Sequence, residues 1–143
     1  MGNMLWLFML SKGVDADAIH GDLRQSARER ALKNFQSGSH VVLVATDVAA
    51  RGIHVDDVDV VVHFDPPEEH KGYVHRSGRT ARAGREGIVV TLVLWDQELA
   101  VEQLQRRLGL RQPIIEVFSN DPRLADLVTL DSPAPRRKVA TAS

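Results

Sequence analysis

The chain has 143 residues, and its 18 Lys and Arg against 19 Asp and Glu give a formal net charge of −1 at pH 7. The length suits one domain, and the 43% of apolar and 26% of charged residues exclude a disordered or fibrous chain. The absence of cysteine excludes disulfides, thiolate metal sites and cysteine nucleophiles, and the balanced charge means that nucleic-acid binding needs a local basic patch.

The first predicted element is a helix over residues 4–12, which Gly13 ends. Residues 4–10 are all apolar, an unusual pattern for a helix that has one face in water. No apolar run approaches the ~20 residues that span a bilayer, and no basic residue precedes this one as in a secretion signal. The sequence therefore predicts a cytoplasmic protein that does not enter a membrane.

Short apolar runs and amphipathic segments alternate along the following part of the chain. Strands are expected at residues 18–20, 41–45, 58–62 and 88–94, and helices at residues 23–36 and 98–108. Runs that do not alternate between apolar and polar residues suit strands buried on both faces of a parallel sheet. The order strand, helix, strand predicts an α/β fold, with an antiparallel α+β fold as the alternative.

The ends and inner faces of the two helices can also be predicted. Asp22 and Gln25 have the spacing of a capping box for the first helix, Gly38 follows its end, and Gly109 ends the second. The inward-facing side chains are expected to be Ala27, Ala31, Leu32, Phe35, Leu99, Leu104 and Leu108. From residue 121 the apolar pattern decays, so residues 121–143 are predicted to be a disordered tail.

The strongest functional signal is the segment HRSGRTARAGR at residues 75–85, which holds four arginines and no acidic residue. Like charges repel, so the cluster needs water or a polyanion around it. If residues 73–77 end a helix, Arg79 and Arg82 lie three residues apart just after it and can converge on one phosphate, which the guanidinium fork binds through parallel hydrogen bonds. A solvated basic loop is the alternative, but the regular arginine spacing favours the phosphate site.

Two further segments follow predicted strands, at the sheet edge where ligands bind in open α/β folds. Thr46 and Asp47 come directly after the strand over residues 41–45, and a threonine hydroxyl beside helix amides suits a phosphate oxygen. An ordinary helix N-cap is the alternative there. Gly21, Gln25 and Arg28 follow the first strand and suit contacts to a nucleic-acid backbone, with an exposed charged helix face as the alternative.

These segments, in this order, resemble the second, C-terminal RecA-like domain of DEAD-box ATP-dependent RNA helicases. The resemblance covers residues 13–110 and rests on HGDLRQSARERAL, VLVATDVAARGI, VVHFDPP and YVHRSGRTARAG. It implies an α/β fold with a RecA-like parallel sheet flanked by helices on both faces. The implied domain takes up residues 13–120, after an apolar helical segment over residues 1–12 that is not part of the family pattern.

The resemblance also implies roles for individual residues. Arg79 and Arg82 are implied to be catalytic arginine fingers that reach ATP on a partner domain, which also holds the Mg²⁺. The ATP site and the link between the domains are implied to involve His75, Arg76, Asp47, Arg51 and His54. The RNA backbone is implied to be held, through phosphates and 2′-hydroxyls, by Gly21, Gln25, Arg28, Thr46 and Gly52. No metal ligands are expected within this chain.

The chain departs from the family pattern at two places. His54 stands where the family has an aspartate that accepts hydrogen bonds from the ATP ribose, and a protonated histidine offers no acceptor, so weaker ribose binding is expected. The sequence also contains no G-x-x-x-x-G-K-[ST] phosphate loop and no D-E-A-D tetrad. The resemblance therefore implies that this chain alone does not hydrolyse ATP, and that the N-terminal RecA-like domain is absent from it.

Residues 1–10 stand where the family has a strand and most of a helix. At about 1.5 Å per residue, this stretch forms fewer than three helical turns, so an N-terminal truncation and a missing interior strand are expected. A sheet without an interior strand exposes unpaired backbone groups. The sequence therefore predicts a marginally stable or self-associating protein.

Three functions are compatible with the sequence. The chain is expected to be one half of a helicase, which supplies arginine fingers and half of the RNA groove to an N-terminal domain. The alternatives are a stand-alone RNA- or protein-binding module without ATPase activity, and a truncated product without a function. Intact Arg79 and Arg82, together with Gln25, Arg28 and Thr46, favour the first, but the sequence does not separate the other two.

Overall fold

The computed structural model describes residues 2–50, 53–81 and 84–125. Two compact units divide the chain, Met1–Val55 and Asp56–Ser143. Each unit contains one pair of parallel strands with its own helices. The predicted α/β class is therefore confirmed, and the parallel pairing excludes the antiparallel alternative for the strands described.

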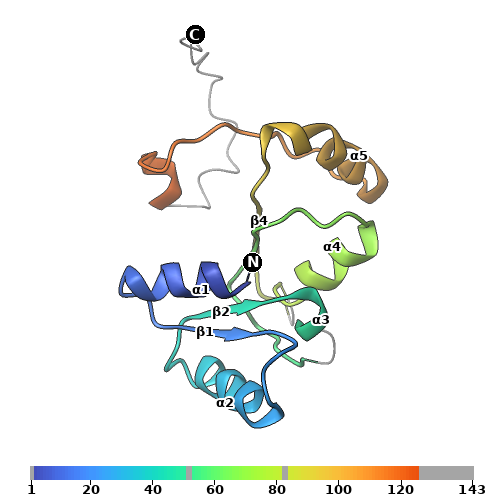
Figure 1. Ribbon diagram of the computed structural model, residues 1–143. Coiled ribbons are helices and arrows are strands. Elements are labelled where there is room, and N and C mark those ends of the chain that lie inside the picture. The colour runs from blue at the N-terminus through green and yellow to red at the C-terminus, as the bar shows by residue number, and fades with distance from the viewer. Residues whose placement is uncertain (1, 51–52, 82–83, 126–143) are drawn as a thin grey trace. The chain divides into compact units, whose positions relative to one another are not determined.

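In the first unit, β1 (Ala16–Ile19) and β2 (Val42–Ala45) run parallel and in register from end to end. The helices α1 (Gly2–Ser11) and α2 (Gln25–Gln36) lie on opposite faces of this pair (Figure 1), as expected for a sheet flanked by helices on both faces. The short helix α3 (Asp47–Ala50) follows β2 directly. The core between these elements consists of Ile19, Ala31 and Ala49, with Leu32, Leu43 and Ile53 packed against it.

The predicted N-terminal helix is confirmed as α1, and Gly13, with a φ of 76°, lies in the turn that follows it. Its inner face is fixed by Trp6, whose indole N–H donates a hydrogen bond of 2.9 Å to the carbonyl oxygen of Ala16. On the outer face, Met4, Leu7 and Phe8 are exposed. The all-round apolar composition of this helix therefore leaves apolar side chains in water.

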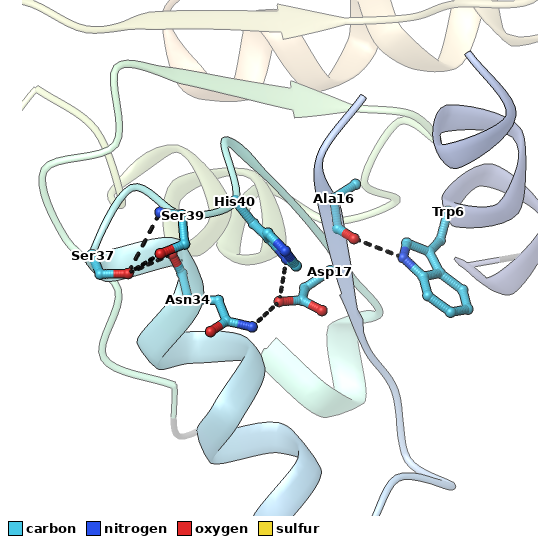
Figure 2. A network of polar contacts seen from close by, with 7 residues as sticks. All are labelled: Trp6, Ala16, Asp17, Asn34, Ser37, Ser39 and His40. Atoms are coloured by element: carbon cyan, nitrogen blue, oxygen red, sulfur yellow. Dashed lines mark hydrogen bonds and ion pairs between the residues drawn. The ribbon is translucent and has the colours of Figure 1, made fainter. Parts of the chain in front are cut away.

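A network of polar contacts ties β1 to the end of α2 and to His40, two residues before β2 (Figure 2). The Asp17 carboxylate accepts hydrogen bonds from the Asn34 amide at 3.0 Å and from His40 Nδ1 at 2.6 Å. Ser37 and Ser39, in the turn between Asn34 and His40, join their hydroxyls at 2.9 Å. One carboxylate on β1 thus fixes both ends of the connection between α2 and β2.

The helix α2 begins two residues later than predicted, and the predicted capping box of Asp22 with Gln25 is wrong. The N-cap is Arg24, which makes no side-chain capping bond, and the Gln25 amide donates along the helix to Glu29 at 3.1 Å. A side chain on the first helical turn reaches the residue four positions on as readily as it reaches back, so the spacing alone does not decide. The predicted end is confirmed, because Gly38 has a φ of 77°.

In the second unit, β3 (Val60–His63) pairs in parallel with β4 (Ile88–Thr91), and α4 (His70–Ser77) connects them. Beyond β4 come the 3₁₀ turn η1 (Trp95–Gln97) and the helix α5 (Glu98–Leu108). Gly109, with a φ of 70°, ends α5 as predicted. The buried side chains of α5 are Val101 and Leu104, whereas Leu99, predicted to face inward, is 65% exposed.

The expectation that the strands are buried on both faces is wrong for much of their length. Val62 on β3 is 54% exposed, and no residue of β4 is fully buried. The four strands form two separate two-stranded sheets in the described part of the chain, so few neighbours are available to cover both faces.

The helices of the described residues are all too short or too polar to span a membrane.

The predicted disordered tail falls mainly on residues 126–143, which lie outside the described residues. Within the described part, the 3₁₀ turn η2 (Pro122–Ala125) follows Asp121. The Asp121 carboxylate accepts hydrogen bonds from the backbone N–H and the guanidinium of Arg123, the latter at 2.7 Å. The start of the predicted tail is therefore a locally bonded turn.

Candidate functional site

The first unit brings the ends of β1 and β2 together at one edge. Because the two strands are parallel and in register, His20 and Gly21 follow β1 where Thr46 and Asp47 follow β2. The backbone N–H of Thr46 donates to the carbonyl of Ile19 at 3.2 Å, which holds the two strand ends side by side. This is the sheet edge at which ligands bind in α/β folds.

Arg28 joins this edge from α2. Its guanidinium donates a hydrogen bond of 3.1 Å to the carbonyl oxygen of Ala49, in the helix that starts just after Thr46. Gln25, one turn earlier on α2, is exposed and bonded to Glu29. Gly21 is exposed, and a Cβ at its position would touch nothing within 4 Å. The predicted RNA-binding residues Gly21, Thr46 and Arg28 are thus gathered around one edge of the first unit.

The second unit gathers the arginine motif at the end of α4. His75 and Arg76 lie in the last turn of this helix, Gly78 caps it, and Arg79 follows. The Arg76 guanidinium donates to the carbonyl of Asp65 at 2.9 Å and so ties the helix end to the segment after β3. The predicted helix end before Arg79 is therefore confirmed.

Among the described residues, the side chains of His75 and Asp56 lie next to the Arg79 guanidinium. Nη2 of Arg79 is 3.0 Å from Nε2 of His75, and Nη1 is 3.7 Å from the carboxylate of Asp56. Arginine is always a donor, so His75 accepts here with an unprotonated Nε2. The Arg79 side chain keeps 23% of its surface in solvent. It is therefore held from two sides and still reachable by a ligand.

Asp56 and Thr80 are residues of this site that the sequence analysis did not single out. Thr80 is 4% exposed, and its hydroxyl donates to the carbonyl of Val58, while the backbone N–H of Val58 donates to the carbonyl of Arg79 at 3.1 Å. Thr80 lies within the arginine-rich segment at residues 75–85, so the sequence already placed it close to the predicted site. Asp56 has no comparable signal, because it approaches Arg79 only through the fold.

The structure also describes two of the remaining predicted site residues, His54 and Asp47. His54 is exposed, and its backbone carbonyl accepts a bond of 3.4 Å from Gln36. Asp47 is exposed at the start of α3. Arg51, Gly52 and Arg82 lie outside the described residues. Among the described residues, no group of three or more His, Asp or Glu side chains could hold a metal ion.

A comparison with protein families matches residues 3–84 to the helicase conserved C-terminal domain. Among curated proteins, DEAD-box ATP-dependent RNA helicase 9 of Arabidopsis thaliana, a mitochondrial protein, is 44% identical over 104 residues, 73% of this chain. Nucleolar RNA helicase 2 of Rattus norvegicus is 44% identical over 97 residues, 68% of this chain. The chain spans only 17% and 12% of the lengths of these two relatives.

Solved structures give the same match at the level of the fold. The DEAD-box protein SrmB of E. coli, bound to regulator of ribonuclease activity A, aligns with a TM-score of 0.72 and 38% identity, over 81% of this chain and 68% of that one. S. cerevisiae Dbp5 bound to RNA and ADP BeF3 aligns with a TM-score of 0.77 and 30% identity, over 91% of this chain and 35% of that one.

Proposed function

Since this chain belongs to the family of helicase C-terminal domains, as the C-terminal RecA-like domain of a DEAD-box RNA helicase, we propose that it supplies arginine fingers to an ATP site and half of an RNA groove. The ATP and its Mg²⁺ are bound by an N-terminal RecA-like domain. ATP binding closes the two domains on RNA, and hydrolysis lets them open again.

The observation that carries this proposal is the placement of Arg79. It follows the end of α4, is held by contacts to neighbouring segments and keeps part of its side chain in solvent. An arginine held this way stabilises the charge that develops on a transferred phosphoryl group and accelerates hydrolysis by about 10³–10⁵-fold. Arg82 is proposed as the second finger from the arginine motif alone.

The RNA part of the proposal rests on the edge of the first unit. Three residues at this edge suit a sugar–phosphate backbone: Arg28 with its guanidinium, Thr46 with its hydroxyl, and Gly21, which has no side chain to keep a backbone away. Contacts of this kind do not depend on the identity of the bases. The relative Dbp5 has been solved with RNA bound, which supports the same use of this fold. Binding through phosphates predicts affinity that is independent of base sequence and falls with salt.

The test supplies the N-terminal RecA-like domain of a DEAD-box relative to the full chain, in trans or by fusion, and measures RNA-stimulated ATP hydrolysis. Replacing Arg79 by lysine keeps the charge but removes the planar fork, so we expect turnover to fall about 10³-fold. Arg107→Lys on the exposed face of α5 is the matched control and is expected to keep full turnover. Undiminished turnover in Arg79→Lys would falsify the proposal.

A second candidate function is a binding module that holds RNA or protein without an ATPase partner. The observation that favours it is that Arg28, Thr46 and Gly21 are gathered within the first unit alone. The relative SrmB, solved with a regulator of ribonuclease activity bound, shows that a related protein also binds protein partners. RNA affinity of the isolated chain, measured by fluorescence anisotropy, tests this candidate, and no salt-dependent binding contradicts it.

The cytoplasmic location expected from the sequence stays a prediction. One relative is named as a mitochondrial helicase and another as a nucleolar one, so the family is used in several compartments. Expression of the full chain with a fluorescent label and organelle markers tests the expected location directly.

A further inference from the structure

We propose that Asp56 is a positioning residue for Arg79: its carboxylate holds the guanidinium in the direction that the transferred phosphate requires. The inference rests on the proposed function of Arg79 and extends it to a residue outside the arginine motif. Asp56 lies four residues before β3, whereas Arg79 follows α4, so only the fold brings the two together.

The segment over residues 56–59 contacts Arg79 and Thr80 at several points. Its first side chain, Asp56, faces the Arg79 guanidinium at 3.7 Å. The backbone N–H of Val58 donates to the carbonyl of Arg79, and the carbonyls of Val58 and Asp59 accept the Thr80 hydroxyl, the latter at 3.4 Å. The same short segment therefore fixes the backbone of Arg79 and lies against its side chain.

The turn that carries Arg79 is tightly constrained from its other side as well. Ala81 has a φ of 57°, a left-handed conformation that a residue with a Cβ adopts only when its surroundings impose it. A Cβ added at Gly87 would clash with the Thr80 hydroxyl, so the chain entering β4 packs directly against the turn. With the backbone set in this way, the direction of the guanidinium depends on the groups that contact it, among which the described part of the chain includes His75 and Asp56.

The charge and the distance favour a holding role for Asp56. A carboxylate attracts a guanidinium at 3.7 Å, and shielding of the Arg79 side chain, which is 23% exposed, strengthens this attraction over that in bulk water, although Asp56 is 41% exposed. The separation exceeds that of a bidentate arginine–carboxylate pair, in which both oxygens take hydrogen bonds. Asp56 therefore orients the guanidinium without the close, forked contact that a phosphate makes.

The experiment compares Asp56→Asn with Asp57→Asn in the full chain supplied with the N-terminal RecA-like domain. Asp57 is the exposed neighbour with a φ of 61°, and asparagine adopts this conformation readily, so both variants lose one negative charge from the same segment. Misdirection of a transition-state contact lowers kcat, so we expect about a 5-fold drop in kcat with little change in KM for Asp56→Asn. We expect Asp57→Asn to match the unmodified chain and Asp56→Glu to restore most of the lost kcat.

A double-mutant cycle shows whether Asp56 acts through Arg79. In the Arg79→Ala background, Asp56→Asn is expected to cause no further loss. A second measurement is NMR of the arginine side chains in the chain without its partner domain. There, Asp56→Asn is expected to alter the Arg79 Nε–H signal and Asp57→Asn to leave it unchanged. Thermal melting of each variant shows that the fold is kept.

The outcomes separate this inference from the proposed function. If Arg79→Ala slows turnover but Asp56→Asn does not, or if Asp56→Asn is equally harmful without Arg79, Asp56 is not a positioning residue and the arginine finger stands. Faster turnover in Asp56→Asn also overturns the inference, because it shows a carboxylate that competes with phosphate. If Arg79→Ala leaves turnover unchanged, the proposed function fails and this inference fails with it.

Discussion

Two single side chains, His54 and Arg28, bear on the nucleotide and RNA binding that the family resemblance implies. The family resemblance implies an aspartate where this chain has His54, and the His54 residue is exposed, so packing does not explain the histidine. Arg28, by contrast, is partly buried against the start of the segment after β2 and has a defined backbone partner in Ala49. We expect His54 to affect the affinity for nucleotide and Arg28 to contact RNA.

Replacing His54 by aspartate is expected to tighten nucleotide binding in the chain joined to an N-terminal domain. One well-placed hydrogen bond to the ribose contributes about 1 kcal/mol, which corresponds to roughly a 5-fold lower Kd. Isothermal titration calorimetry with ATP or an analogue measures this, and His54→Asn serves as the uncharged comparison. An unchanged Kd contradicts the prediction.

Replacing Arg28 by alanine is expected to weaken RNA binding and to make the remaining affinity less sensitive to salt. Loss of one phosphate contact lowers the slope of log K against log salt by about 0.7 for single-stranded RNA. Arg30→Ala removes an exposed charge from the same helix and is the matched control. Equal effects of the two variants would show that only general charge matters.

At the scale of elements, the connection between α2 and β2 depends on one carboxylate. Asp17 accepts hydrogen bonds from both Asn34 and His40, and its side chain is only 22% exposed, so water cannot fully replace these bonds. Substitution of Asp17 removes a charged acceptor from Asn34 and His40, and the loss of hydrogen bonds at a partly buried site lowers the free energy of unfolding.

Asp17→Asn is expected to lower the free energy of unfolding by about 1–2 kcal/mol. Urea unfolding followed by circular dichroism measures the difference. Asp15→Asn, at an exposed position just before the same strand, removes the same charge and is expected to be nearly neutral. Equal stability of the two variants would mean that the contacts to Asn34 and His40 contribute nothing.

The turn η2 depends on pH through Asp121. Hydrogen bonds from the Arg123 side chain and backbone lower the pKa of the Asp121 carboxyl from 3.8 to about 2. A folded-state pKa below the unfolded value means that the contact stabilises the turn above pH 3.8 and is lost as the pH falls through about 2. NMR titration of Asp121 measures this, and a midpoint near 3.8 would contradict it. Arg123→Gln is expected to raise the midpoint toward that value.

At the scale of the whole molecule, exposed apolar surface and short sheets predict self-association. The outer face of α1 presents Met4, Leu7 and Phe8 to solvent, and each described sheet has two strands, both of them edges. Size-exclusion chromatography with light scattering is expected to show oligomers whose population rises with concentration. Leu7→Lys with Phe8→Lys is expected to reduce them, and a clean monomer of the unmodified chain would disprove the prediction.

Much of the fold follows from local sequence patterns, whereas the site depends on contacts that patterns do not contain. The helix ends at Gly38 and Gly109 were predictable because glycine adopts the left-handed conformation that these turns need. The exposure of Leu99, which was predicted to face inward, was not predictable, since helical spacing defines a stripe but not which edge of it meets a neighbour. The approach of Asp56 to Arg79 joins residues 23 positions apart and had no signal in either segment.

The two tryptophans of the chain fall in different units and in opposite surroundings. Trp6 is half-buried with its indole bonded to β1, whereas Trp95 is 85% exposed in the second unit. The fluorescence emission of Trp6 is therefore expected to shift to longer wavelength when the first unit unfolds, whereas the emission of the exposed Trp95 is already at long wavelength in the folded chain. Trp6 fluorescence therefore reports loss of structure around β1, and Trp95→Phe would remove the other tryptophan's contribution to the signal.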